Sequence, residues 1–254
     1  MDEMRKPLQG IWNIIRFNWH FYLIAFILIV LLFYIQNYFS SAARFCVDVL
    51  LISGISSIFI SLLVSAYIYD FSGFYNLKWL NHLIHPEPEK IININAGFDE
   101  TSNLLKNKYR KAEIKVYDFY NREKHTEISI SRARIAFQPY PGTLMINTSE
   151  IPLENNSADN IFCILTAHEI RNREERNSFF RELYRVLSPE GHLIITEHLL
   201  DVPNLLAYTI GAFHFHTKVT WLKAFRSANF HIKHRIKVNP FITTFILTKN
   251  GIAS

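Results

Sequence analysis

A glycine and a carboxylate in the middle of the chain have a spacing that suggests a binding site. Gly97 follows the apolar segment Lys90–Ile94, within the stretch KIININAGFDETSNLL, and Asp118 follows the apolar segment Ile114–Tyr117. A glycine lets the backbone approach a ligand closely, and a carboxylate about 20 residues further on can accept hydrogen bonds from both hydroxyls of a ribose. This pair predicts a site for a nucleoside-bearing cofactor.

Other polar residues end apolar segments in the same way. Because ligands of an open α/β sheet bind outside the carboxyl ends of its strands, these residues are expected to share one edge with Gly97 and Asp118. They are Asn93 and Asn95 in the first segment, Asn147 and Thr148 after the third, and Thr166, His168 and Glu169 after the fourth.

Two histidines are candidate catalytic residues. His168 ends the apolar segment IFCILTAH, and a near-neutral pKa would suit it to remove a proton from a hydroxyl acceptor; the alternative is a histidine that hydrogen-bonds the following loop. His214 lies in GAFHFHTK, where the aromatic segment Tyr208–His216 is interpreted either as a lid over an acceptor pocket or as core packing. His214 and His216 have no third ligand at a diagnostic spacing, so no metal site is predicted.

The elements that must position these residues alternate between strands and helices. This alternation, with short connections, predicts a three-layer α/β sandwich with a mainly parallel sheet, whose last strand is antiparallel because it follows its neighbour so closely. Seven strands are expected near Lys90–Ile94, Ile114–Tyr117, Thr143–Asn147, Ile161–His168, His192–Glu197, Phe230–Val238 and Thr243–Lys249, and helices near Thr101–Lys111, Thr126–Phe137, Arg173–Leu187 and Thr217–Ala228.

Two uncharged apolar runs precede this domain. Phe21–Ile35 has about 15 residues and apolar flanks that extend it towards the roughly 20 needed to cross a bilayer, and Val49–Tyr69 is long enough by itself. The short linker Gln36–Arg44 predicts a transmembrane hairpin, for which a cleaved signal peptide at the first run is the alternative. Pro86 and Pro88 mark a boundary, so we expect residues 1–85 to be the hairpin with its juxtamembrane segment and residues 86–254 the α/β domain.

Charge and cysteine content bound the partners and the location. The net charge of +5 is spread along the chain without a basic cluster among aromatic residues, which favours anionic lipid over nucleic acid as a partner. Arg5, Lys6 and Arg16 precede the hairpin whereas Arg44 alone lies in its loop, so both termini and the domain are expected on the cytoplasmic side of the inner membrane. The chain has two cysteines, which give no disulfide framework.

The α/β domain resembles the class I S-adenosylmethionine-dependent methyltransferases, in particular the branch that includes quinone-biosynthesis enzymes. The best stretch is IPLENNSADNIFCILTAHEIRNREERNSFFRELYRVLSPEGHLIITEH, Ile151–His198. The family's opening motif is an acidic residue, an apolar residue and then Gly-x-Gly-x-Gly; here Asn93 replaces the acid, Asn95 and Asp99 replace the outer glycines, and Gly97 is retained. Asn and Asp tolerate positive φ, so we expect the turn to survive.

The resemblance implies a Rossmann-like fold, S-adenosylmethionine as cofactor, and a role for each polar residue at the sheet edge. Gly97 would lie against the methionine part, Asp118 on the ribose, and Asn147 with Thr148 near the adenine. Asn93 and Asn95, at the motif's other positions, are also expected to bind the cofactor. With the hairpin, it predicts a methyltransferase acting on O or C of a lipophilic acceptor, such as a quinone-like ring, a phenol or a lipid. The alternatives are a non-catalytic membrane scaffold and a small-molecule methyltransferase that is merely tethered.

Overall fold

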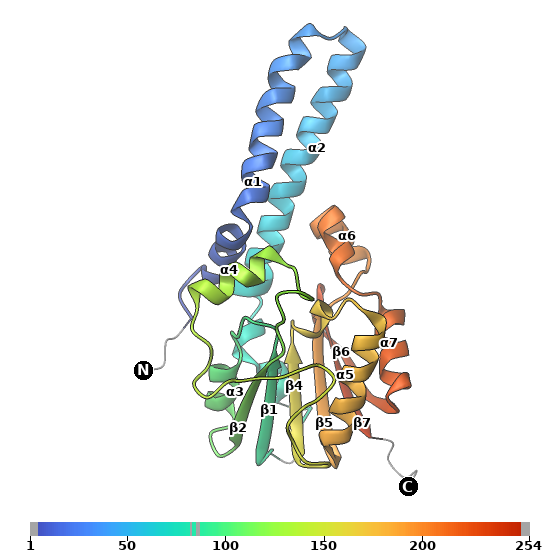
Figure 1. Cartoon of the computed structure of the whole chain (residues 1–254). Helices are drawn as coiled ribbons and strands as arrows, with labels where there is room; N and C mark the ends of the chain where they lie inside the picture. Colours follow the sequence, from blue (N-terminus) through green and yellow to red (C-terminus); the bar gives the residue numbers. More distant parts are fainter. Residues whose placement is uncertain (1–4, 82, 85–86, 250–254) are drawn as a thin grey trace.

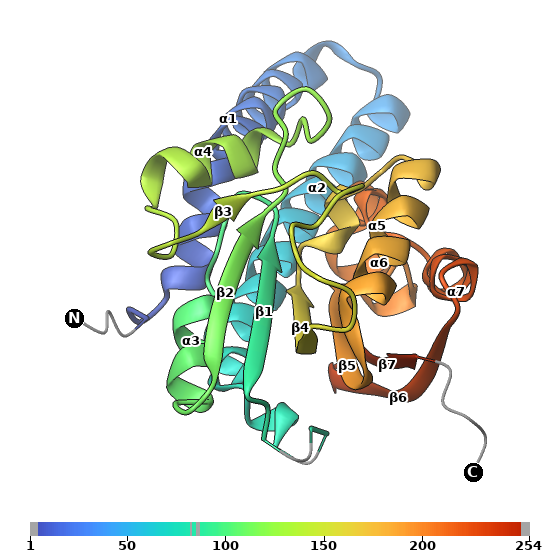
Figure 2. The same cartoon turned by 60° about the horizontal axis from the view of Figure 1, so that its bottom comes forward.

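A seven-stranded sheet forms the centre of the computed structural model, which describes residues 5–81, 83–84 and 87–249 (Figures 1 and 2). The strands are β1 Lys90–Asn95, β2 Glu113–Asp118, β3 Leu144–Met145, β4 Ala158–Ile164, β5 Leu187–His198, β6 Phe230–Asn239 and β7 Ile242–Lys249. Their order is β3-β2-β1-β4-β5-β7-β6, and β7 runs antiparallel to both of its neighbours. The predicted fold class is therefore confirmed, although β3 is shorter than expected and β5 begins earlier.

The helices of the α/β domain cover both faces of the sheet. They are α3 Ser102–Lys108, α4 Ile128–Ala136, α5 Arg173–Val186, α6 Val202–Tyr208 and α7 Lys218–Ser227. Helices α5 and α7 bury large side chains against one face, among them Phe179, Phe180, Trp221 and Phe225. The amphipathic pattern of α5 predicts this face because Phe179, Phe180 and Leu183 recur at helical spacing.

The opposite face of the sheet is covered by α3 and by the segment that follows the hairpin. Ile68, Phe74 and Leu80 from this segment pack with Leu105 of α3 against Phe162 and other residues of the sheet. Leu80, which follows the second apolar run, is fully buried and does not face a membrane surface. The core of the α/β domain thus includes residues before the boundary expected at residue 85.

Two long antiparallel helices stand on the carboxyl edge of the sheet (Figure 1). They are α1 Gln9–Ile35 and α2 Ser41–Ala66, joined by the short helix η1 Gln36–Tyr38. Both are long and apolar enough to cross a membrane. The backbone of α1 departs from helical geometry at Asn18, whose Nδ2 donates to the Ile14 carbonyl at 3.0 Å.

At the base of the hairpin, a carboxylate that follows α2 binds the first turn of α1. Asp70, in the π-helical turn η2 Tyr67–Phe71, accepts hydrogen bonds from the backbone N–H groups of Gly10 and Ile11 at 2.8 and 2.9 Å. These are donors of the first turn of α1, which has no capping side chain of its own at Leu8. Asp70 therefore caps α1 from the end of α2 and fixes how the two helices meet the domain.

Replacing Asp70 tests this cap. We expect Asp70→Ala to lower the free energy of unfolding by about 1–2 kcal/mol, because two helix N–H groups lose their acceptor and the helix dipole loses a compensating charge. Denaturant unfolding of the purified protein, with Glu190→Ala at an exposed position near the start of β5 as control, measures the difference. Equal stability of Asp70→Ala and the control would contradict the capping role.

Candidate active site

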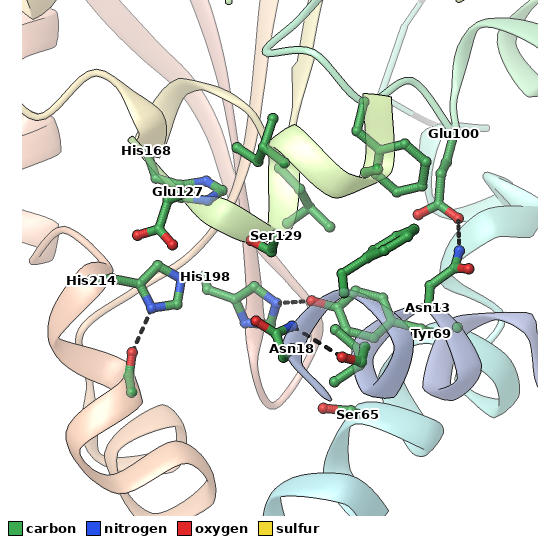
Figure 3. A pocket seen from close by; sticks show the side chains of 18 of the residues that line it. Asn13, Asn18, Ser65, Tyr69, Glu100, Glu127, Ser129, His168, His198 and His214 are labelled. Atoms are coloured by element: carbon green, nitrogen blue, oxygen red, sulfur yellow. Dashed lines mark hydrogen bonds between the residues drawn. The ribbon is translucent and has the colours of Figure 1, made fainter. Parts of the chain in front are cut away.

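A cavity of about 580 Å³ lies between the carboxyl edge of the sheet and the base of the hairpin (Figure 3). Its walls come from α1, α2, the turn after β1, helix α4, the loop after β4 and the segment α6–η6, where η6 is Thr209–His214. In Figure 3, His168, His198 and His214 reach the cavity from the α/β domain, whereas Asn13, Ser65 and Tyr69 reach it from the hairpin. Two parts of the chain that are distant in sequence thus share one enclosed site.

The turn after β1 keeps its shape without the outer glycines of the family motif. Gly97 has a φ of 92°, and its N–H donates to Asn95 Oδ1 at 3.2 Å. Asp99 Oδ1 accepts from the N–H groups of Thr101 and Ser102, both at 2.9 Å, and so caps α3. The turn therefore survives as expected, but for another reason: Asn95 and Asp99 do not have positive φ, and their side chains hold the turn by hydrogen bonds.

Asn93 contributes to the turn from inside β1. Its Nδ2 donates to Ser102 Oγ at 2.7 Å and to Thr101 Oγ1 at 3.0 Å, and its side chain is buried. These bonds hold the start of α3 against the strand. Asn93 therefore faces the helix, and the cofactor contact expected for it stays a prediction.

Asp118 lies at the predicted edge, but its carboxylate is occupied by the protein itself. Oδ1 accepts from the N–H of Tyr120 at 2.8 Å, and Oδ2 forms an ion pair with Arg134 of α4. The space next to Gly97 is also filled, because a Cβ added there would lie 3.0 Å from side-chain atoms of Tyr120, Ile130 and Arg134. Helix α4 thus covers the crevice that Gly97 and Asp118 form.

Asn147 and Thr148 follow β3, next to the end of β2. The register pairs Asp118 with Met145, which places Asn147 just beyond that pair, and Asn147 is exposed. Thr148 Oγ1 donates to Glu175 Oε1 at 2.6 Å, at the start of α5. The structure therefore brings Asn95, Gly97 and Asp118 together at one edge with Asn147 beside them, and it turns Thr148 towards α5.

His168 is held between two carboxylates. Its Nδ1 lies 2.7 Å from Glu197 Oε2 and its Nε2 lies 3.0 Å from Glu169 Oε1. Burial disfavours the charged imidazolium, but the two carboxylates outweigh burial and raise the pKa of His168 to about 10. The pKa is therefore raised above the near-neutral value expected for this histidine, because the two carboxylates stabilise its imidazolium, and its catalytic role stays a prediction.

His214 has the opposite protonation state. Its ring centroid lies 5.8 Å from that of His168, and its Nδ1 contacts the carbonyl of Gly211. Desolvation and the charge of His168 lower the pKa of His214 to about 4. With its proton on Nδ1, the ring is neutral and Nε2 is its basic nitrogen. Among residues 5–81, 83–84 and 87–249, no group of three His, Cys, Asp or Glu side chains is placed to hold a metal ion.

A hydrogen-bonded pair in the cavity wall, Tyr69 and His198, joins the hairpin to the sheet. The sequence did not single out either residue. Tyr69 Oη lies 3.0 Å from His198 Nε2 (Figure 3). On its other side, His198 Nδ1 lies 3.0 Å from Asn204 Oδ1. The Nδ2 of Asn204 donates to the carbonyl of Phe241, so its Oδ1 accepts the His198 N–H and His198 Nε2 accepts the Tyr69 hydroxyl. Burial lowers the pKa of His198 to about 3, which keeps it neutral.

One signal could have found His198. It ends β5 directly after Glu197, at the same sheet edge that made His168 a candidate. No comparable signal exists for Tyr69, because in the sequence it is the last residue of an apolar run.

Comparisons with known proteins agree with this geometry. Residues 97–195 match a family model described as a methyltransferase domain. A demethylmenaquinone methyltransferase of Thermotoga maritima is 29% identical over 161 residues, which are 61% of this chain and 65% of that protein. The matched part thus spans slightly less than two thirds of this curated relative.

Solved structures show the same fold. A SAM-dependent methyltransferase from Aquifex aeolicus is 17% identical with a TM-score of 0.52, covering 75% of this chain and 97% of that one. Human N-acetylserotonin methyltransferase, solved in complex with SAM, is 15% identical with a TM-score of 0.50, covering 76% of this chain and 55% of that one. These structures confirm the predicted fold, and the match of residues 97–195 to a methyltransferase domain supports that activity and S-adenosylmethionine as its cofactor.

The residues at the sheet edge fit this cofactor in chemistry. Gly97 offers a backbone without a Cβ, and Asp118 offers the carboxylate that ribose hydroxyls need. The side chain that does not fit is Arg134, because it occupies Asp118 Oδ2. A ribose can reach Asp118 after Arg134 has moved away.

Removing Arg134 tests this competition. We expect Arg134→Ala to bind S-adenosylmethionine about fivefold more tightly, since binding no longer has to break a partly exposed ion pair worth about 1 kcal/mol. Isothermal titration calorimetry with Arg181→Ala as control gives both affinities. Weaker binding by Arg134→Ala would show that this arginine contacts the ligand and does not compete with it.

The charge of His168 predicts how stability depends on pH. Because its pKa is raised in the folded protein, the ion pairs contribute fully below about pH 6.5, and their contribution falls as the pH rises towards about 10, by at most about 1.4 kcal/mol per pH unit. Unfolding free energies measured across this range should fall more steeply for the wild type than for His168→Gln. Parallel curves would mean that His168 is not an imidazolium in the folded state.

Proposed function

We propose that this class I S-adenosylmethionine-dependent methyltransferase domain is anchored in a membrane and methylates O or C of a lipophilic acceptor. The cavity carries the proposal, because its walls come both from the cofactor edge of the sheet and from two long apolar helices. An acceptor that fills it would contact hairpin side chains such as Phe21 and Ser61 and domain side chains such as His168.

The exposure of the hairpin supports the membrane anchor. In the most apolar 18-residue window of each helix, none of α1 and 17% of α2 is buried in the protein. A core helix would bury such a surface, whereas a transmembrane helix exposes it to lipid. Arg5, Lys6 and Arg16 lie on the domain side and Arg44 in the loop, which favours a cytoplasmic domain at an inner membrane.

The chain's own residues can divide the work of methyl transfer. S-adenosylmethionine supplies a methyl group on a positively charged sulfur. Gly97 and Asp118 would hold its nucleoside part, and the hairpin and α4 exclude water from the cavity. Tyr69 Oη, which donates to His198, can accept a hydrogen bond from an acceptor hydroxyl. His214 is neutral and is therefore the histidine suited to take the acceptor's proton.

A quinone-like ring is the acceptor that the relatives favour. The Thermotoga maritima relative is a demethylmenaquinone methyltransferase by name, and such a ring with an apolar tail suits a cavity at the base of a membrane hairpin. Anchoring raises the effective concentration of an acceptor that dissolves in the bilayer.

The ion pair of Arg134 with Asp118 favours a second candidate, a non-catalytic membrane scaffold with a methyltransferase fold. In that case the arginine would keep the crevice closed. Calorimetry separates the two: the enzyme binds S-adenosylmethionine and loses affinity in Asp118→Ala, whereas the scaffold releases no heat with either protein.

Turnover tests the acceptor class. We expect the protein with labelled S-adenosylmethionine to yield labelled product from a membrane-lipid extract. Labelled product from the aqueous extract alone would instead indicate a small-molecule methyltransferase that is tethered to the membrane.

The role of Tyr69 can be separated from cofactor binding. Tyr69→Phe should lower kcat by about fivefold to tenfold, because one oriented hydrogen bond of about 1 kcal/mol is lost, and leave the affinity for S-adenosylmethionine unchanged. Tyr67→Phe, two residues away and exposed, is the matched control. A Tyr69→Phe enzyme with unchanged kcat would exclude Tyr69 from the reaction.

A further inference from the structure

The segment α6–η6, Val202–His214, exposes an apolar surface beside the hairpin. Four side chains on its outer face are largely exposed: Val202 at 69%, Leu206 at 72%, Ile210 at 84% and Phe213 at 67%. Figure 1 shows α6 raised above the rest of the α/β domain, next to α2. Large apolar side chains gathered in this way mark a contact surface.

The inner face of the segment is the more polar one. Asn204 is fully buried and bonds to His198 and to the carbonyl of Phe241, with Ala207 and Ala212 buried beside it. Residues 202–216 contain no Asp, Glu, Lys or Arg. A helix in water places apolar residues inside and charged residues outside, so the arrangement of α6–η6 is inverted relative to a solvent-facing helix.

The segment lies at a definite level of the hairpin. Thr209 Oγ1 lies 3.3 Å from Ser57 Oγ, in the middle of α2. Ser57 is about 16 residues from Ser41, where α2 begins at the turn of the hairpin. At 1.5 Å per residue it lies roughly 23 Å from the turn, level with His20 of α1, which is about 15 residues before the end of that helix at Ile35. This is about 7 Å inside the inner boundary of a hydrocarbon layer roughly 30 Å thick that begins at the turn, a depth that amphipathic segments reach.

We infer that α6–η6 is a third membrane-contacting element, which buries Val202, Leu206, Ile210 and Phe213 in the inner interfacial layer of a phospholipid bilayer. The inference rests on the proposed membrane anchor and adds a surface that the hairpin does not require. Amphipathic segments of this kind lie in the plane of the interface with their apolar face towards the acyl chains.

Cations flank the segment where headgroups would lie. Arg171 donates to the carbonyl of His214, and Lys218 begins α7 and is exposed. Arg171 also forms an ion pair with Glu127 at 3.4 Å, so the exposed Lys218 is the better suited of the two to an anionic headgroup.

In this position, the segment places one side of the cavity next to the bilayer. Ile210 and Gly211 line the cavity together with Phe21, Tyr22 and Ser61 of the hairpin. An acceptor dissolved in the inner leaflet can therefore enter sideways, between η6 and the hairpin, without crossing water. The lid expected at Tyr208–His216 stays a prediction, which the proposal extends because the same segment lines the cavity and carries the exposed apolar face.

Depth-dependent fluorescence quenching tests the inference without any methyl transfer. Single cysteines replace Leu206 or Phe213 in the full chain carrying Cys46→Ser, where the remaining native thiol, Cys163, is buried. Each is labelled with an environment-sensitive dye in vesicles of phosphatidylcholine and phosphatidylglycerol that contain lipids with a quencher at a shallow or a deep acyl position. Ile27 in α1 provides the inserted control site, and the exposed Glu190 near the start of β5 provides the water-exposed one.

We expect the shallow quencher to act on dyes at Leu206 and Phe213, the deep quencher to act on the dye at Ile27, and neither to act on Glu190. Quenching at Ile27 with none at Leu206 and Phe213 would overturn the inference and leave the anchor intact. Quenching at none of the four sites would overturn the anchor as well.

Discussion

One carboxylate joins the two parts of this protein. Glu100 accepts hydrogen bonds from Arg5 Nη1 at 2.9 Å, from Tyr75 Oη at 2.6 Å and, more weakly, from Asn13 Nδ2 at 3.4 Å. Arg5 precedes α1, Asn13 belongs to α1 and Tyr75 follows α2. Glu100 belongs to the turn that carries Gly97. The base of the hairpin and the cofactor turn are therefore held as one unit, and the cavity between them depends on this contact. A hairpin attached by a flexible linker would hold the domain at the same membrane but would not form an acceptor site with it.

The electrostatics of the cavity follow from how its histidines are paired. His168 faces Glu169 and Glu197 and is charged, and its charge helps to keep His214 and His198 neutral. A fixed cation at the sheet edge and two neutral imidazoles nearby give the site separate groups for charge compensation and for proton transfer. This division would be invisible from residue types alone, since all three side chains are histidines at or near the same edge.

The sequence predicts the sheet well because each strand is an apolar run bounded by turn residues, and the alternation with helices fixes a parallel order. It also predicts that Asn95, Gly97, Asp118 and His168 share an edge. What it misses depends on contacts between distant residues. The protonation of His168 is set by Glu197, which lies in another strand, and the closure over Gly97 is set by the side chains of α4. The burial of Leu80 was missed for the same reason, because an apolar residue next to a membrane segment has the same pattern whether it faces lipid or a sheet.

The central claim is that a membrane-dissolved molecule meets the cofactor edge in the cavity at the base of the hairpin. Mass spectrometry of cells that express the chain and are fed methionine with a deuterated methyl group tests it most directly. The account predicts a lipid-soluble species that carries one added deuterated methyl group in cells with the wild-type chain and lacks it in cells with Asp118→Ala. Labelled product confined to the water-soluble fraction, or no difference between the two chains, would contradict it.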